Sequence, residues 1–463
     1  MKRTSNILNQ VLSPLLRRAG GGYLLIAFCI CNLLACKKTT TSPYPSDTFL
    51  KVYSLPLAKG QGTSTTANSV YSIVSDQSGY IYTYYDDSLP GSTATYSDAS
   101  SIAILKTDKY GNIVWKKHYA VFYVHGQDAY YYNFICNGQT LYLLGQDTLN
   151  NWTILKFNCS DGQLTGQIPL NGLLPTGSVA GSLYVIGMTL NNEGDFMLSS
   201  WYNVSNGFQA PMLTRLNTDG SVKWSKSDFP IPSLHPHESF ENIRCITETG
   251  TGDFLVGTVL LSLPDSNASY EIATFTMNFY HFSSTGNLLS KDSLPGGASI
   301  GYQNTSFYGR FYNSDGEINS FSTFPAPQGG YIIVADENYQ FSSYRLKIFK
   351  TDNSFNVLDS AFIAPPNCNL YYSGIIQKAD GTIVVSVIDE ALPLTNNFGY
   401  VYEVAPDLTI KKIEQIGLTS QSVVINGMNA TYDGHIIMSG VIQKNGIDTN
   451  NLFILKTDNN EHF

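Results

Sequence analysis

The stretches IGMTLNNEGDFMLSS (residues 186–200) and MLTRLNTDGSVKWSK (residues 212–226) decide the fold. Each begins with an apolar run, reaches a turn built from Gly, Asp or Asn, and continues into a second run, as β-hairpins do. Those turn residues supply the backbone conformations that tight hairpins need. Two consecutive hairpins of this kind predict one four-stranded antiparallel sheet.

The same pair of hairpins recurs seven times along the chain, which is typical of a repeat architecture. The first hairpin of the pair occupies residues 71–85, 134–145, 186–200, 243–257, 321–335, 374–388 and 427–440. The second occupies residues 102–118, 153–167, 212–226, 275–291, 345–361, 400–413 and 452–460. The abundant Tyr, Phe, Thr, Val and Ile favour strands, and no long helical pattern interrupts them. The sequence therefore predicts an all-β fold of seven four-stranded antiparallel blades.

The spacing of the repeats exceeds that of familiar propellers. The turn glycines of the first hairpins lie 51 to 78 residues apart, whereas propeller blades commonly repeat every 40–50 residues or so. We expect the excess to lie in loops. The widest interval, between Gly252 and Gly330, also leaves room for an extra hairpin.

The two ends of the repeat array complement each other. The last repeat stops soon after residue 460 and lacks a fourth strand, whereas residues 49–56 form a strand-like run with no partner of its own. Joining residues 49–56 to residues 452–458 would complete the last blade and cover its exposed strand edges. The sequence therefore predicts a closed seven-bladed β-propeller rather than an open solenoid.

Two of the second hairpins share a motif of Asp, turn Gly and Trp. It is carried by Asp108, Gly111 and Trp115, and again by Asp219, Gly220 and Trp224. This pattern resembles the blades of pyrroloquinoline-quinone-type dehydrogenases and related secreted bacterial propellers, which implies the same architecture. The chain has neither eight complete repeats nor adjacent cysteines after residue 36, so we expect no cofactor. A quinone-dependent dehydrogenase remains a third functional alternative.

The N-terminus has the pattern of a secretory signal. Lys2, Arg3, Arg17 and Arg18 precede an apolar run over residues 23–34, and no acidic residue accompanies them. The run covers about a dozen residues, while a membrane-spanning helix needs roughly 20. We therefore assign residues 1–35 to a signal peptide, residues 36–47 to a flexible tether and residues 48–463 to the propeller domain.

The end of the apolar run, LLAC at residues 33–36, resembles the lipobox of bacterial lipoproteins. The resemblance implies that a diacylglycerol is attached to the thiol of Cys36 and that cleavage occurs just before it. Attached acyl chains hold a protein at a membrane because each buried CH₂ contributes about 0.8 kcal/mol. We expect export and anchoring at the bacterial cell envelope, with the outer membrane favoured and the leaflet open. The alternative is an ordinary signal peptide that happens to contain a cysteine.

The charge of the chain excludes one class of partner. The formal net charge is −9, and removing the four basic residues of the signal peptide takes it to −13. A body this acidic argues against nucleic acid, whose phosphates need basic side chains.

The connections between hairpins and between blades are long, and strand order places them on the face opposite the glycine turns. Binding residues commonly lie on such loops. The loops at 121–132 and 301–312 are rich in aromatic and amide groups, and residues 235–238 read His-Pro-His-Glu. The candidate ligand residues are Tyr123, His125, Asp128, Tyr130, His235, His237, Glu238, Tyr308 and Tyr312. Alternatively, the tyrosines pack between blades and the histidines are plain surface; we expect no metal, since catalytic zinc needs three protein ligands.

Four cysteines remain besides Cys36. Cys136 and Cys159 fall at the two turns of one predicted blade, which emerge on the same face. We predict that these two lie close enough to form a disulfide, which a Cα separation above about 7 Å would exclude. Cys245 and Cys368 are interpreted as small buried apolar residues.

Catalytic signatures are missing from the sequence. It contains no G-x-S-x-G, no H-E-x-x-H, no phosphate-binding loop and no dinucleotide fingerprint. We therefore predict a non-catalytic binding or scaffolding propeller whose ligand is a glycan or a protein. The alternative is a hydrolase or lyase acting on polysaccharide, whose paired carboxylates could come from separate blades.

Overall fold

The computed structural model describes the greater part of the propeller domain. The described residues are 48–55, 70–87, 101–119, 133–146, 151–176, 178–204, 209–227, 229, 239–262, 270–302, 314–339, 343–363, 369–390, 398–416, 421–444 and 450–457. The chain divides into two units, Met1–Ser46 and Asp47–Phe463, and every described residue belongs to the second. Within these ranges, no helix has both the length and the apolar character needed to cross a membrane.

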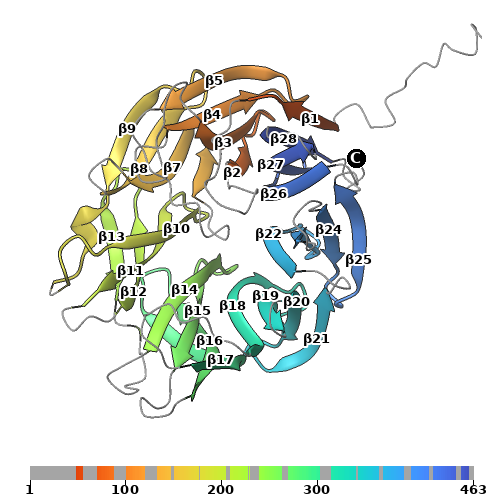
Figure 1. The fold of residues 1–463 in the computed structure, drawn as a ribbon. Helices are drawn as coiled ribbons and strands as arrows, with labels where there is room; N and C mark the ends of the chain where they lie inside the picture. Colours follow the sequence, from red (N-terminus) through yellow and green to blue (C-terminus); the bar gives the residue numbers. More distant parts are fainter. Residues whose placement is uncertain are drawn as a thin grey trace, which may run out of the picture. The chain divides into compact units, whose positions relative to one another are not determined.

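Residues Asp47–Phe463 form a seven-bladed β-propeller, as the repeats predicted (Figure 1). Blade 1 comprises β2 (Val70–Ser75), β3 (Ile81–Asp87), β4 (Ser101–Thr107) and β5 (Ile113–Tyr119). Blade 2 comprises β6 (Phe134–Asn137), β7 (Thr140–Gln146), β8 (Trp152–Asn158) and β9 (Leu164–Pro169). Blade 3 comprises β10 (Tyr184–Leu190), β11 (Phe196–Asn203), β12 (Gln209–Leu216) and β13 (Val222–Lys226).

The later blades repeat this order, with the first strand of each nearest the centre of the ring (Figure 1). Blade 4 comprises β14 (Ser239–Glu248), β15 (Phe254–Ser262), β16 (Tyr270–Phe282) and β17 (Leu288–Tyr302). Blade 5 comprises β18 (Ser314–Pro325), β19 (Tyr331–Tyr339), β20 (Ser343–Thr351) and β21 (Val357–Ile363). Blade 6 comprises β22 (Asn369–Gln377), β23 (Ile383–Glu390), β24 (Phe398–Val404) and β25 (Ile410–Ile416). Blade 7 comprises β26 (Gln421–Ala430), β27 (Ile436–Lys444), β28 (Asn450–Lys456) and β1 (Phe49–Tyr53).

The burial of each strand follows from its place in the blade. A middle strand has a neighbouring blade on both faces, so β7 is buried along nearly its whole length and reads as a continuous apolar run, TLYLLGQ. An outer strand such as β5, IVWKKHY, is exposed or half-buried throughout. The apolar runs that marked the repeats in the sequence are therefore the middle strands.

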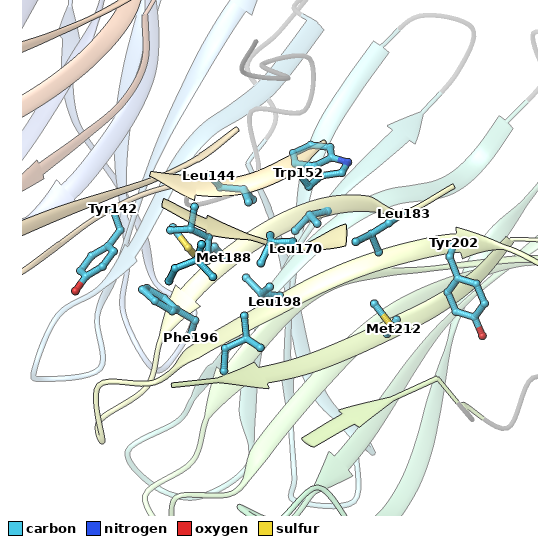
Figure 2. Packing of buried hydrophobic residues seen from close by; sticks show 14 residues of the cluster. Tyr142, Leu144, Trp152, Leu170, Leu183, Met188, Phe196, Leu198, Tyr202 and Met212 are labelled. Atoms are coloured by element: carbon cyan, nitrogen blue, oxygen red, sulfur yellow. The ribbon is translucent and has the colours of Figure 1, made fainter. Parts of the chain in front are cut away.

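Buried apolar side chains form seven clusters, one at each interface between consecutive blades. The cluster between blades 2 and 3 includes Leu144 and Trp152 from one blade and Phe196 and Met212 from the other (Figure 2). The cluster between blades 7 and 1 joins Tyr53 and Leu452 to Ile73. The core is therefore circular, and the interface that closes the ring is packed like the others.

The N-terminal strand completes the last blade, as predicted from the two incomplete ends. β1 pairs antiparallel with β28 over its whole length, from Phe49 opposite Lys456 to Tyr53 opposite Leu452. The hydroxyl of Tyr53 donates a hydrogen bond of 2.6 Å to the carbonyl oxygen of Gly111 in blade 1. β1 therefore belongs to blade 7 and also contacts blade 1.

The tryptophans of the repeated motif hold neighbouring blades together. Trp224 on β13 donates from Nε1 to the carbonyl oxygen of Ser284 in blade 4 at 3.0 Å, and it covers Gly286 so closely that a Cβ there would lie 2.7 Å from the ring. Trp115 makes the equivalent contacts with Cys159 and Gly162 of blade 2. At the ring closure, the Phe49 ring takes this place against Gly111, where an added Cβ would lie 2.5 Å away.

The long interval between Gly252 and Gly330 is explained by long strands. β16 and β17 contain 13 and 15 residues and form one extended hairpin. The end of β17 then pairs with the start of β18 at Ala298–Asp315, which joins blades 4 and 5 into one eight-stranded sheet. No additional hairpin is present among the described residues of this interval.

Candidate functional site

The candidate ligand residues chosen from the sequence lie outside the described part of the chain. This applies to Tyr123, His125, Asp128, Tyr130, His235, His237, Glu238, Tyr308 and Tyr312, and also to the lipidation candidate Cys36. Their roles stay predictions. The candidate site consists of other residues, all from blades 3, 4 and 5.

Cys136 and Cys159 lie side by side in blade 2. Both are free thiols, and their sulfur atoms are 3.9 Å apart, whereas a disulfide bond measures about 2.05 Å. The hydrogen bond to Cys159, together with burial, raises the pKa of the Cys136 thiol well above its usual range. The disulfide stays a prediction.

One long connection on the loop-rich face is described almost completely, and it positions an aromatic pair. It joins blades 2 and 3 over residues 170–183 and includes the short 3₁₀ helix η1 (Asn171–Leu173). Leu170 and Leu183 anchor its two ends in the core between these blades (Figure 2). Near its end, Ser182 donates to the carbonyl oxygen of Val179 at 2.6 Å and accepts from the backbone N–H of Asn203 at 3.1 Å. The loop is thereby fastened to the end of β11.

Directly after this loop, Tyr184 stacks face to face on Trp201. The residues are opposite each other at the start of β10 and near the end of β11, their ring centroids are 3.9 Å apart, and their planes differ by 12°. Tyr184 remains 40% exposed. Because Trp201 covers one face of the tyrosine ring, the exposed area comes from the other face, the edge and the hydroxyl group.

Strand alternation shows which neighbouring blade this pair faces. Leu198 and Tyr202 point into the core between blades 2 and 3 (Figure 2), so Met197, Ser199 and Trp201 lie on the opposite face of β11. Met197 packs in the cluster between blades 3 and 4, which confirms this orientation. The Tyr184–Trp201 pair therefore lies on the blade 4 side of blade 3.

A cavity of about 120 Å³ lies further along the same face, where the inner strands of three blades meet. Its lining comes from β10 and β11 of blade 3, β14 of blade 4 and β18 of blade 5. The lining residues are Gly187, Met188, Thr189, Ser199, Arg244, Cys245, Ile246, Thr247, Ser322, Thr323 and Phe324. Ser199 precedes Trp201 by two positions on one strand face, so the cavity begins about 7 Å from the aromatic pair.

Arg244 and Cys245 are the chemically distinctive residues of this lining. Among the lining side chains that the structure describes, Arg244 carries the one full charge. The Cys245 sulfur lies 3.3 Å from Thr323 Oγ1, and burial raises the pKa of its thiol to about 11, so it is uncharged at neutral pH. Cys245, expected from the sequence to be buried, is half-buried.

These groups are suited to holding a polar ligand. Stacked aromatic rings bind the apolar faces of sugar rings, and hydroxyl and guanidinium groups donate hydrogen bonds. No Asp or Glu occurs among the described residues that line the cavity, and no three described His, Cys, Asp or Glu side chains come together as a metal site.

Sequence reasoning missed Tyr184, Trp201 and Arg244 because it looked for function in long loops rather than on strands. Aligning the seven first hairpins by their turn glycines would have singled out Arg244. At the same position, eight residues before the turn glycine, four other blades carry Tyr71, Ile186, Ser373 and Asn426. The stacked pair had no comparable signal, because its two residues are brought together by the register of β10 and β11.

No known protein-family model matches the chain, and no curated protein sequence does. Solved structures share the fold. A puromycin-hydrolyzing peptidase of Mycobacterium tuberculosis is 8% identical to this chain, with a TM-score of 0.46. The match covers 86% of this chain and 55% of the peptidase, so this chain spans about half the length of that peptidase. The polysaccharide lyase Uly1 is 9% identical, with a TM-score of 0.49, and the match covers 90% of this chain and 94% of the lyase. The NanB sialidase of Streptococcus pneumoniae (a point mutant) is 10% identical, with a TM-score of 0.41, and the match covers 88% of this chain and 71% of the sialidase. Likeness at this level concerns the fold and says nothing about activity.

Proposed function

We propose that this chain is a lipid-anchored, non-catalytic binding propeller of the bacterial cell envelope, and that its ligand is a glycan held against the Tyr184–Trp201 pair. The observation that carries the proposal is this exposed, parallel stack on a rigid blade. Aromatic side chains offer large apolar area at low entropic cost, and a tyrosine adds a hydroxyl that can bond a sugar hydroxyl. The fastened loop 170–183 keeps the pair in place before the ligand arrives, which reduces the cost of binding.

A binding role is also consistent with the chemistry of the neighbouring cavity. Hydrolysis of glycosidic bonds ordinarily needs two carboxyl groups roughly 5–9 Å apart. The described lining instead offers hydroxyl groups, a thiol and a guanidinium. These groups can bind and orient a saccharide.

Replacing Tyr184 with alanine is expected to weaken glycan binding about tenfold. The stacked ring contributes on the order of 1.5 kcal/mol through contact with one face of the sugar. The full chain, purified in detergent, is first screened on a glycan array, and the affinity of any bound glycan is then measured for Tyr184→Ala. Tyr432→Ala is the matched control, because Tyr432 is 77% exposed but lies in the β26–β27 turn on the other face.

Three outcomes would count against this assignment. If no glycan binds, a protein partner replaces the glycan. If Tyr184→Ala and Tyr432→Ala lower affinity equally, the stacked pair is not the binding surface. If a reducing-end assay detects turnover of the bound glycan, the protein is an enzyme on polysaccharide.

Replacing Cys36 with serine is expected to release the protein from the membrane. The lipobox-like residues 33–36 motivate this expectation, because serine lacks the thiol that would receive the lipid. The chain is expressed in a bacterial host with radiolabelled palmitate, and label and membrane association are followed after fractionation. Cys31→Ser, in the apolar run, should leave both unchanged. Label retained by the Cys36→Ser variant would disprove lipidation at this position.

A further inference from the structure

The described part of the chain begins on the face that carries the glycine turns, at the rim between blades 7 and 1. Phe49, the first residue of β1, packs on Gly111 in the β4–β5 turn. Cys36 lies twelve residues before Thr48, so even a fully extended backbone would keep a lipid-bearing Cys36 within about 40 Å of this rim. A membrane that holds such an anchor is therefore within reach of the side chains around the start of β1.

Cations gather at this rim. The rim patch is defined as residues 50–52 of β1 together with residues 109–117 of the β4–β5 turn and β5. It contains no Asp or Glu, and its charged residues are Lys51, Lys109, Lys116 and Lys117. Lys51 Nζ donates to Asn112 Oδ1 at 3.0 Å, which joins the two parts of the patch. In a chain of net charge −9, a basic surface of this kind is a local exception.

Exposed apolar and aromatic side chains lie among these cations. Leu50, Val52, Ile113 and Val114 are each about half-exposed. Tyr110 is exposed at the tip of the turn, and the ammonium group of Lys109 lies 5.1 Å from the centroid of its ring. Tyrosine, lysine and aliphatic side chains are the groups that proteins place where lipid headgroups meet water. The composition of the patch therefore suits a bilayer surface of negative charge.

Other outer strands do not combine these features. β17 and β21, on the opposite side of the ring, also expose leucines, but their charged residues include Asp292 and Asp359 (Figure 1). β13 contains two lysines, and one of them, Lys223, pairs with Asp195 at 2.6 Å. At blades 7 and 1, by contrast, several lysines, exposed apolar side chains and the start of β1 occur together.

We propose that the rim patch rests on the anionic phospholipid headgroups of the membrane that holds the lipid anchor, so that the loop-rich face points away from that membrane. Lysines close to an anionic bilayer are attracted to it, and a tether lets a weak contact form because it raises the local concentration. Phe49 lies at the glycine-turn end of β1, whereas Tyr184 lies at the loop end of β10. Contact at the patch therefore leaves the Tyr184–Trp201 pair open to ligands. The inference rests on the lipid anchor of the proposed function and adds to it the orientation of the domain.

The test measures how fast individual lysines of the anchored protein react with an uncharged succinimidyl ester. The lipidated protein, purified in detergent, is transferred to vesicles of phosphatidylcholine or of equal parts phosphatidylcholine and phosphatidylglycerol, and labelled lysines are identified by mass spectrometry. Lys109 and Lys117 should react roughly fivefold more slowly on the anionic vesicles, as expected for charges attracted to that surface. Because salt screens exposed charges, about 0.5 M sodium chloride should remove most of this difference. Lys291, exposed on β17, is the control and should react equally on both.

A charge-reversed variant shows whether the patch itself causes the protection. Lys116→Glu combined with Lys117→Glu should return the reaction rate of Lys109 on anionic vesicles to its rate on phosphatidylcholine, whereas Lys291→Glu should leave the protection unchanged. Equal unfolding midpoints of the variants show that lost protection is not loss of fold.

The outcomes separate the patch from the anchor on which it depends. Flotation of the protein with phosphatidylcholine vesicles tests the anchor alone. A protein that floats but shows equal labelling on both kinds of vesicle would overturn the patch while the anchor stands. Protection of Lys291 as strong as that of Lys117, or full protection in the charge-reversed variant, would also overturn it. Failure to float with either kind of vesicle would remove the anchor and the patch together.

Discussion

Removing the N-terminal strand is expected to destabilise the propeller by on the order of 5 kcal/mol, a large fraction of the stability of a typical protein. A chain that begins at Pro56 lacks all of β1, and with it the five-residue ladder to β28. It also loses the side chains of Phe49 and Tyr53 from the interface with blade 1, and the hydrogen bond from Tyr53 to Gly111. The measurement is urea unfolding, compared with a chain that begins at Thr48.

The physical reason is that β1 does two things at once. It covers the edge of β28, which would otherwise offer unpaired backbone groups to other molecules. It also supplies the outer-strand aromatic residue that fills the space over a turn glycine of the next blade, as Trp115 and Trp224 do elsewhere. We therefore expect the shortened chain to aggregate as well as to unfold at lower urea concentration.

If the shortened chain does not fold at all, a point substitution in β1 still tests the contribution of this strand to stability. Phe49→Ala should cost about 3 kcal/mol, since it leaves a cavity over Gly111. Leu50→Ala is the matched control, because Leu50 lies next to Phe49 but is half-exposed. Equal unfolding midpoints for Phe49→Ala, Leu50→Ala and the unaltered chain would contradict closure through this contact.

Replacing Arg215 with methionine is expected to destabilise the protein by about 3 kcal/mol at neutral pH. Arg215 is nearly inaccessible, and its Nη2 and Nε atoms bond Asp195 Oδ2 at 2.6 and 2.8 Å. Its Nη1 atom donates to the carbonyl oxygen of Ser284 in blade 4 at 2.7 Å. Removing the guanidinium leaves the Asp195 carboxylate buried with Lys223 as its remaining cation, and breaking a buried pair in this way typically costs several kcal/mol.

The same ion cluster gives a pH dependence with a definite sign. Burial alone would raise the pKa of Asp195, but the hydrogen bonds and charges of Lys223 and Arg215 outweigh it, so the pKa lies below its ordinary value. A carboxylate whose pKa is lower in the folded state stabilises the fold above the unfolded value of about 3.9, and this contribution is lost as the pH falls through the folded-state pKa. The difference in stability between wild type and Arg215→Met should therefore shrink below about pH 4.

Urea unfolding at several pH values tests this account. Lys378→Met is the control, because the ion pair between Lys378 and Glu403 is more exposed and its loss should cost less than about 1 kcal/mol. If Arg215→Met were no more costly than Lys378→Met at pH 7, or if its cost stayed constant down to pH 3, the buried cluster would not act as described. The cluster also crosses from blade 3 to blade 4, the two blades that carry the aromatic pair and Arg244.

Much of the fold could be predicted because each turn and strand is specified by its own residues, and the same pattern recurs in every blade. Each turn contains its own Gly, Asp or Asn; the Asp108 carboxylate, for example, accepts from the backbone N–H groups of Tyr110 and Asn112. Each middle strand shows its burial in its own composition. Where the pattern of one repeat is ambiguous, comparison with the other six resolves it. The number of blades and the completion of the last one could therefore be inferred without coordinates. The length of β16 and β17 could not, because an extended hairpin and an additional one have similar local patterns.

The candidate site required the tertiary structure. The sequence by itself determined a ring of hairpins and the completion of its last blade by residues 49–56, since both follow from side-chain periodicity and turn chemistry within short segments. Only the folded ring decided that Trp201 meets Tyr184 and that Arg244 shares a cavity with Ser199 and Thr323. Those contacts depend on strand register, on a one-residue bulge and on the approach of blades far apart in sequence. Strand register and the approach of different blades leave no periodic trace in the chain, because both are set by packing between segments and not within one.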